Sequence, residues 1–297
     1  MFRRRAPPSL GERPPFPDRF AAGEALVSRL QALHLADSEP RPLVLALPRG
    51  GVPVAAVVAR SLRAPLDLLL VRKIGAPGQP ELAVAALVDG TPPRVVANGS
   101  LCEALGVDTA YLARASQAAI AENARRRRLY LGGRPTPNVA RRCVIVVDDG
   151  VATGTTMLAA LEALRAQRPR RLVVAVPVSS REAAARLRPL VDDWICLAEP
   201  VPFEAVGRHY RQFEQVGDDE VMRALAMAAP EEAACPMGQY RGAVAQQPAG
   251  SAAGAQSIGP VVEPVAGTAT GTATEQVREA DPGAGHIASA GRDAATS

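Results

Sequence analysis

Residues 143–156, CVIVVDDGVATGTT, are the most informative segment of the 297-residue chain. The first five residues are apolar throughout, which predicts a strand buried on both faces. Two aspartates and two glycines follow within 148–154 and predict a loop. Beyond this loop, apolar residues recur at helical spacing, so we expect a helix over 155–167. The segment is therefore expected to be a strand–loop–helix unit of an α/β protein.

The same alternation extends in both directions from this unit. Further strands are expected at 43–47, 66–71, 172–178 and 194–197, and further helices at 19–34, 52–62, 108–131 and 181–190. Residues 82–98 are ambiguous and are compatible with a hairpin. Apolar strands that alternate with helices indicate a mainly parallel sheet covered on both faces, which is a three-layer α/β fold. A ligand is then expected at the carboxyl ends of the strands.

The composition changes near residue 230. Residues 1–229 carry a net charge of +8, whereas residues 230–297 carry −4, contain no Leu, Phe or Trp, and are rich in Gly and Ala. Such a segment buries too little apolar surface to offset the entropy of ordering the chain. We therefore expect one folded domain over 15–229, followed by a disordered low-complexity tail over 230–297.

Several classes of protein are disfavoured. The chain has no apolar run of about 18 residues, as a membrane-spanning helix would need, and prolines follow the basic start where a signal peptide would be apolar. The four cysteines are far apart and lack metal-ligand spacing. The net charge of +4 is too small to indicate nucleic-acid binding. We expect a cytoplasmic protein with small-molecule substrates, no membrane or nucleic-acid partner, and a homodimer as an open alternative to a monomer.

The loop after the central strand carries the groups that a sugar phosphate needs. Backbone N–H groups at a helix N-terminus favour an anion, and Gly150 and Gly154 allow close approach. The carboxylates of Asp148 and Asp149 suit vicinal hydroxyls or Mg²⁺. An ordinary capped turn is the alternative, but it does not need two acids, two glycines and three threonines. A Walker A loop and a dinucleotide-binding loop are excluded because their Gly-Lys-Ser/Thr and Gly-x-Gly-x-x-Gly patterns are absent here.

Residues 146–156 resemble the 5-phosphoribosyl-1-pyrophosphate (PRPP) binding motif of type I phosphoribosyltransferases, with an apolar strand, two acids and Ala-Thr-Gly-x-Thr. Residues 48–51 after the first core strand resemble the pyrophosphate loop of that family, and residues 72–73 resemble its basic pyrophosphate contact. Residues 15–225 as a whole resemble a bacterial branch of the family. The resemblance implies a three-layer α/β domain with a small hood, which we place in the first helix and the 198–225 segment.

The resemblance also implies roles for individual residues. Asp148 and Asp149 would bind the ribose hydroxyls, which in turn ligate Mg²⁺, so the cofactor is held through PRPP and no direct side-chain ligand is assigned. The 5′-phosphate would lie against Gly150, Val151, Ala152, Thr153, Gly154, Thr155 and Thr156. The pyrophosphate would contact Pro48, Arg49, Gly50, Gly51, Arg72 and Lys73. We predict Arg49, Lys73 and Asp149 as catalytic residues: Arg49 and Lys73 would stabilise the charge on the departing pyrophosphate, and Asp149 would hold the ribose hydroxyls that ligate Mg²⁺.

The implied activity is Mg²⁺-dependent transfer of a phosphoribosyl group from PRPP to a nitrogen acceptor such as a nucleobase, with release of pyrophosphate, in nucleotide metabolism. One departure concerns Ala152, since some purine-salvage members have an aspartate there that can act as a general base. This departure disfavours purine salvage of that kind. It also keeps open the alternative of a non-catalytic, PRPP-binding regulatory protein.

Two weaker signals remain. Residues 125–128 are four arginines on a predicted helix, where successive side chains point about 100° apart. They are compatible with a solvated helix end, a flap that closes over PRPP, or an RNA-binding surface. His209 and Tyr210 lie in the expected hood, where they could stack on a base or pack in an aromatic core.

Overall fold

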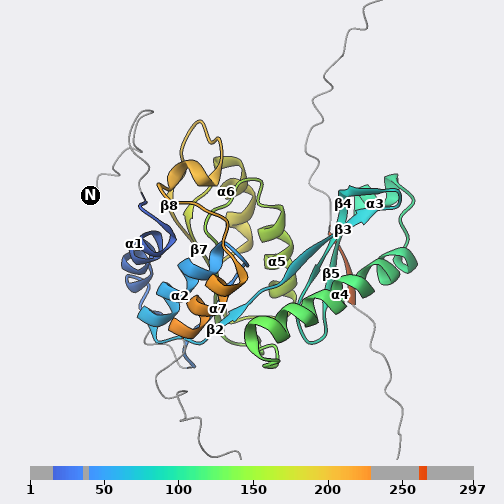
Figure 1. Ribbon diagram of the computed structural model, residues 1–297. Helices are drawn as coiled ribbons and strands as arrows, with labels where there is room; N and C mark the ends of the chain where they lie inside the picture. Colours follow the sequence, from blue (N-terminus) through green and yellow to red (C-terminus); the bar gives the residue numbers. More distant parts are fainter. Residues whose placement is uncertain (1–15, 36–39, 229–260, 266–297) are drawn as a thin grey trace, which may run out of the picture. The chain divides into compact units, whose positions relative to one another are not determined.

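The computed structural model describes residues 16–35, 40–228 and 261–265. Its central element is a five-stranded sheet in the order β2-β1-β6-β7-β8 (Figure 1). The strands are β1 (Leu43–Ala46), β2 (Leu66–Leu68), β6 (Cys143–Val147), β7 (Arg171–Val178) and β8 (Asp193–Ala198). Every neighbouring pair is parallel. The expected parallel sheet is confirmed.

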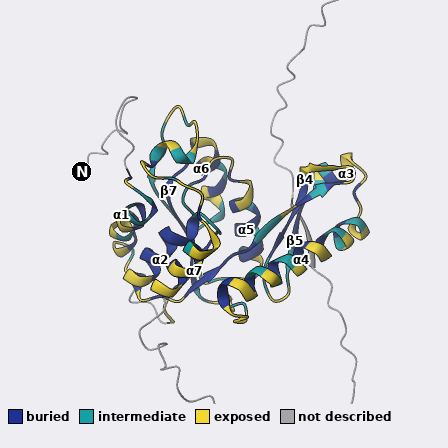
Figure 2. Cartoon of the chain, in the orientation of Figure 1, coloured by how far each residue is buried: buried dark blue, intermediate teal, exposed yellow. Residues whose placement is uncertain are grey.

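Helices cover both faces of this sheet, as expected. One face packs against α1 (Arg19–Gln31), α2 (Gly51–Leu62) and α7 (Asp218–Met227). The other packs against α5 (Thr155–Ala166) and α6 (Arg181–Leu187), which a 3-10 turn (Arg188–Leu190) extends. Along β6, Ile145 and Val147 belong to the first core, whereas Val144 and Val146 belong to the second. Strands β1, β2 and β6 are therefore buried throughout and β7 nearly so, whereas the edge strand β8 is only partly buried (Figure 2).

The strand order places a topological switch between β1 and β6. The chain leaves β1 toward β2 on one side and leaves β6 toward β7 on the other. The two connections therefore diverge at the carboxyl ends of these neighbouring strands, which is where open α/β sheets bind ligands. The loops that begin at residues 47 and 148 lie at this point.

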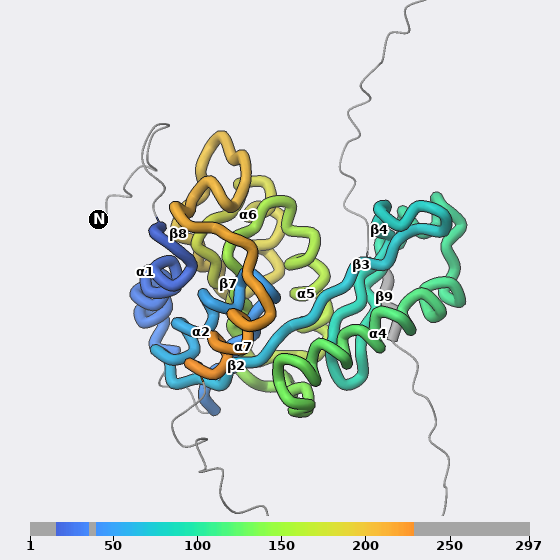
Figure 3. Tube along the Cα trace, in the orientation of Figure 1, coloured from blue at the N-terminus to red at the C-terminus, as the bar shows by residue number. Residues whose placement is uncertain are grey.

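A second, antiparallel sheet contains β3 (Val71–Ala76), β4 (Gln79–Val88) and β5 (Arg94–Asn98). The expected hairpin at 82–98 is therefore present, although β4 begins earlier. The segment 66–71, expected as one strand, instead supplies β2 and the start of β3, and Figure 3 shows the chain passing directly between the two sheets. Composition could not show this change of sheet, because residues 69 and 70 are apolar and buried as well.

The helices of this second sheet are α3 (Gly99–Ala104) and α4 (Thr109–Leu131). Asp108 caps the N-terminus of α4, and its carboxylate accepts a hydrogen bond from the Tyr111 N–H at 2.6 Å. Gly132, which has φ +60°, caps the C-terminus. These are the usual N-cap and left-handed C-cap residues. The sheet and α4 share a separate core that contains Val84, Leu87 and Leu112.

The hood expected from the first helix and 198–225 was placed wrongly. Helices α1 and α7 belong to a layer of the parallel sheet, and the small antiparallel sheet with its helices is the hood. The apolar face of α1, including Leu26 and Leu30, is fully buried and packs beside α2. Periodicity correctly predicts this apolar face, but it does not say against which element the face packs.

Of the expected tail at 230–297, the structure describes only β9 (Val261–Val265), which pairs in parallel with β5. The remainder of 230–297 lies outside the described residues, so its disorder stays a prediction.

Candidate functional site

Asp148 and Asp149 follow β6 at the switch point and are anchored by distant segments. Asp149 Oδ2 accepts a hydrogen bond from Arg19 Nε at 2.9 Å, and the Asp149 carbonyl accepts one from the Tyr210 hydroxyl at 2.5 Å. The Asp149 N–H in turn donates to Asp148 Oδ1 at 2.9 Å. The predicted acidic pair is therefore held at the carboxyl edge of the sheet by residues from α1 and from the segment after β8.

Burial makes ionisation of both carboxyl groups costly. Burial raises the pKa of Asp148 well above its usual value, and the neighbouring Asp149 raises it further. Burial also raises the pKa of Asp149, although the Arg19 guanidinium opposes this shift. Two partly buried acids with one cation between them favour an added cation or hydroxyl donors.

The loop after β1 comes unusually close to this pair. A Cβ on Gly50 would lie 2.1 Å from Asp149 Oδ2, and a Cβ on Gly51 would lie 2.8 Å from the Val147 carbonyl oxygen. Only glycine fits at these two positions without movement. The peptide bond between Pro48 and Arg49 is cis. The predicted pyrophosphate loop and the predicted ribose-binding acids are thus in direct contact.

Arg49 points toward α7 and α4. Its Nη1 lies 3.6 Å from Asp218 Oδ1, which also accepts the Tyr130 hydroxyl at 2.6 Å. These contacts place the predicted catalytic arginine in a polar cluster that the sequence did not reveal.

The loop at 150–156 leads into α5. Val151 forms a bridge to Ser179, and the Ser180 hydroxyl donates to the Ala152 carbonyl at 2.7 Å. Gly154 has φ +72° and is the N-cap of α5, where residues with side chains rarely fit. Ala152, Thr153, Thr155 and Thr156 are exposed. The loop therefore presents hydroxyls and helix N-terminal N–H groups, the arrangement that binds a phosphate.

Arg186 of α6 binds the loop at 150–156, and the sequence did not predict this contact. Its Nη2 donates to the Thr153 carbonyl, and the same nitrogen is the third-nearest atom to a Cβ built on Gly154. The Arg186 guanidinium is thus positioned to stabilise the conformation of the loop at 150–156.

Arg72 and Lys73 both lie on β3, not after the second strand of the parallel sheet. Successive side chains on a strand point to opposite faces. Arg72 lines a pocket with Pro48 and Thr156, whereas Lys73 is exposed and does not line that pocket. The structure therefore brings Arg72 to the predicted pyrophosphate loop and leaves Lys73 apart from it, so the catalytic role of Lys73 stays a prediction.

The pocket includes two residues that sequence reasoning missed, Asn123 and Arg126 of α4. Its complete lining is Leu47, Pro48, Leu69, Leu70, Val71, Arg72, Asn123, Arg126 and Thr156. Arg126 lies within the arginine run, but nothing in the sequence distinguishes it from its neighbours or signals Asn123.

The arginine run does not act as one unit. Arg125 and Arg126 pair with Glu122, and Arg128 is exposed. Arg127 is buried and binds Asp67 at 2.9 Å and Asp89 at 3.0 Å. None of the three expected roles includes a buried ion pair, so the run was interpreted wrongly at Arg127. The cause is that Arg127 shares a helix face with apolar residues, which a charged run conceals.

The aromatic residues of 203–213 form a packed cluster. Tyr210 is buried between Phe16 and Phe213, with ring centroids 5.5 and 4.9 Å away, while His209 stacks on Phe203 at 5.7 Å. Of the two expectations for Tyr210, aromatic packing is confirmed. The cluster also carries Arg19, whose guanidinium lies 3.9 Å from the Phe213 ring centroid.

The donor set suits magnesium held through a substrate. Among residues 16–35 and 40–228, no three His, Cys, Asp or Glu side chains gather as a metal cage. Mg²⁺ commonly uses one or two carboxylates together with substrate oxygens and waters. The oxygens of Asp148 and Asp149 fit that pattern. Cys102, Cys143 and Cys196 are free thiols, and Cys235 lies outside the described residues.

Across the described part of the chain, no helix combines the length and apolar character needed to cross a bilayer.

Fold and site together define a class: a three-layer α/β protein whose sheet edge places two acids beside a glycine-containing helix N-terminus. Residues 20–210 match the family model described as "Phosphoribosyl transferase domain". The chain belongs to the phosphoribosyl transferase family.

Similar proteins agree with this assignment. The chain is 42% identical over 214 residues to "Putative phosphoribosyl transferase Rv0571c" of Mycobacterium tuberculosis H37Rv and equally to "Putative phosphoribosyl transferase MT0597" of strain CDC 1551. Each match covers 72% of this chain and 47% of the relative, so the chain spans about half of their length. The crystal structure of TT1426 from Thermus thermophilus is 42% identical, covering 73% of this chain and 100% of TT1426, with a TM-score of 0.62.

Proposed function

We propose that this protein transfers the phosphoribosyl group of PRPP to a nitrogen acceptor, such as a nucleobase, and releases pyrophosphate with the help of Mg²⁺. The observation that carries the proposal is the contact of the Gly50–Gly51 loop with the Asp148–Asp149 pair. It supports a ligand that has a diol and an anion on adjacent atoms, as PRPP does.

In this proposal, Asp148 and Asp149 accept hydrogen bonds from the ribose 2′- and 3′-hydroxyls. The exposed threonines of 153–156 and the first N–H groups of α5 hold the 5′-phosphate. The loop at 48–51 and Arg72 contact the pyrophosphate. The substrate then spans the carboxyl ends of β1 and β6, with its anomeric carbon between the two loops.

The reaction forms a bond from the acceptor nitrogen to the anomeric carbon and breaks the bond from that carbon to the pyrophosphate oxygen. The nitrogen loses its proton to solvent or to a base. Bound magnesium would supply positive charge to the pyrophosphate oxygens. Arg49 and Arg72 add fixed positive charge where the leaving group gains negative charge, and such preorganised charge is commonly a large catalytic term.

A second candidate is a PRPP-binding regulator without turnover, and Ala152 favours it. The phosphate loop, residues 150–156, contains no ionisable side chain that could accept the proton of an acceptor. A regulator needs the binding groups but not a base.

Calorimetric titration with PRPP and Mg²⁺, followed by pyrophosphate release assays with a panel of nucleobases, tests both candidates. Saturable Mg²⁺-dependent binding together with pyrophosphate release for one base supports the enzyme. Binding without release for every base supports the regulator. Absence of PRPP binding contradicts both.

A further inference from the structure

The pocket beside the predicted pyrophosphate loop has one wall from α4. Pro48 comes from the loop after β1, Thr156 from the first turn of α5, Arg72 from β3, and Asn123 and Arg126 from α4. Helix α4 belongs to the hood, so the pocket joins the hood to the parallel-sheet core. It is adjacent to the groups that would hold a diphosphate.

This wall is cationic because a single carboxylate, that of Glu122, forms ion pairs with three arginines. Glu122 lies 3.5 Å from Arg72 Nη1, 2.7 Å from Arg125 Nε and 3.0 Å from Arg126 Nε. These hydrogen bonds lower the pKa of Glu122 to about 2, so it remains ionised near neutral pH. The four groups keep an excess of two positive charges, which suits a multiply charged anion.

Arg126 has unused donors toward this pocket. Its hydrogen bond to Glu122 uses Nε, which leaves the N–H groups of both terminal nitrogens, and its side chain is 35% exposed. Arg72 is exposed to a similar degree, 34%. A planar guanidinium binds phosphate oxygens through two parallel hydrogen bonds.

Asn123 supplies a polar group that the protein does not satisfy. Its side chain is buried, with a relative exposure of 3%, and its Nδ2 donates to the Leu70 carbonyl at 3.4 Å. Its Oδ1 has no hydrogen-bond partner within the described residues. Buried acceptors are normally paired, so this oxygen calls for a hydrogen-bond donor that the described residues do not supply, such as a buried water.

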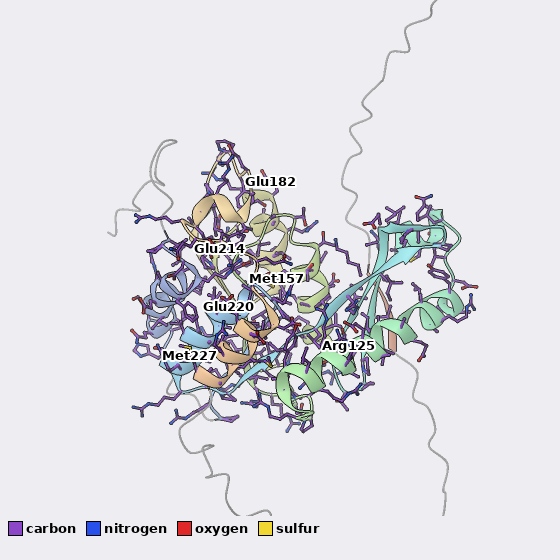
Figure 4. All side chains as sticks on the ribbon, in the orientation of Figure 1. Arg125, Met157, Glu182, Glu214, Glu220 and Met227 are labelled. Carbon is purple, nitrogen blue, oxygen red and sulfur yellow. The ribbon has the colours of Figure 1, made fainter. Side chains whose placement is uncertain are left out.

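Helix α4 is fixed in place at this position. Arg127, the residue after Arg126, is buried in ion pairs with Asp67 in the middle of β2 and Asp89 after β4. Figure 4 labels Arg125 on α4, and Arg125 also feels the charge of Asp218 on α7. Arg126 therefore lies on a helical segment that the ion pairs of the next residue, Arg127, hold in place.

We propose that α4 adds a diphosphate-binding residue to the site: Arg126, acting with Arg72, binds the diphosphate arm of PRPP and the pyrophosphate product. This inference rests on the proposed function. It assigns the hood a binding role that the motif residues do not include.

The test is calorimetric titration with three probes in the presence of Mg²⁺: PRPP, inorganic pyrophosphate, and ribose 5-phosphate, which lacks the diphosphate. For Arg126→Gln, affinity for PRPP and pyrophosphate should fall about 10- to 100-fold, the range for a lost hydrogen bond to a charged group. Affinity for ribose 5-phosphate should stay within about twofold, because that ligand does not reach the pocket. Arg126→Lys should recover part of the loss.

The matched control is Arg128→Gln, two residues along the same helix and exposed; it should change none of the three affinities. Thermal melting of each variant checks folding. Unchanged pyrophosphate affinity in Arg126→Gln, or an equal loss for ribose 5-phosphate, overturns the inference. If the wild type binds no PRPP, the proposed function fails instead, and the pyrophosphate titration still shows whether the pocket binds the anion.

Discussion

Arg19 Nε lies 2.9 Å from Asp149 Oδ2, and 130 positions of sequence separate the two residues. The Arg19 side chain also donates to the Glu214 carbonyl at 2.9 Å and lies against the Phe213 ring. A buried guanidinium held by three partners is a fixed charge. It orients the second acid of the predicted ribose site, so the first helix contributes to the candidate site although it is far from the motif.

Arg19→Gln should therefore raise the pKa of Asp149, because Arg19 is the main influence that lowers it. The low-pH limb of the PRPP binding profile should move to higher pH, while binding at pH 8 changes less. Calorimetry between pH 5 and pH 8 measures this shift. Arg29→Gln, on an exposed position of the same helix, is the control; identical profiles for all three proteins would contradict the role of Arg19.

Asp148→Asn should stabilise the protein and weaken PRPP binding. The pKa of Asp148 is raised in the folded state, so ionisation opposes folding, and this cost grows as pH rises above the unfolded value of 3.8 through the folded pKa. The variant should melt higher than the wild type at pH 7, with the difference shrinking toward pH 4. The asparagine keeps the Oδ1 acceptor for the Asp149 N–H. A lower melting temperature at pH 7 would show that Asp148 is not an unfavourable buried charge.

Gly50→Ala should disrupt the site through contact alone. Gly50 has φ −60° and ψ −37°, which alanine adopts freely, but the added Cβ would lie 2.1 Å from Asp149 Oδ2. Either the loop or the Asp149 side chain must move to relieve this overlap. Such a misplacement should reduce PRPP affinity or turnover on the order of 100-fold. Gly217→Ala is the control, because its φ is −84° and its Cβ would meet no atom within 4 Å. Equal behaviour of the two variants would mean that the loop contact is not required.

Arg127→Met should unfold the protein more easily by about 3–5 kcal/mol, because Asp67 and Asp89 would remain buried without their cation. Burial already raises the pKa of Asp89 despite Arg127. The loss should therefore be largest at neutral pH and smaller at acidic pH, where Asp89 becomes protonated. Urea denaturation at pH 7 and pH 4.5 measures it. Arg128→Gln should stay within about 0.5 kcal/mol of wild type, and a similar cost for both would contradict the buried pair.

Much of the architecture could be predicted locally. The strands β1, β6, β7 and β8 and the helices α2, α4 and α5 were expected within a few residues of their observed ends. Runs of buried apolar residues and helical periodicity depend on neighbouring positions alone. The glycines and acids after β6 likewise predict a binding loop, because turn chemistry and helix termini are local properties.

Other features could not be predicted from local pattern. The passage from β2 to β3 changes sheet within an unbroken apolar run, and Lys73 faces away from the pocket that Arg72 lines because of strand register. The hood was assigned to the wrong elements because an apolar helix face does not specify the element against which it packs.

The strand–loop–helix units and the acidic, glycine-containing loop thus follow from the order of residues, since each is formed by neighbours in the chain. The pairing of Arg19 with Asp149, the burial of Arg127 between Asp67 and Asp89, and the arrival of Asn123 and Arg126 beside Pro48 depend on packing between distant segments. A charge is stabilised in a protein interior only by the partner that folding brings to it. The role of each arginine therefore emerges from the tertiary structure, whereas the loop they surround is already visible in the sequence.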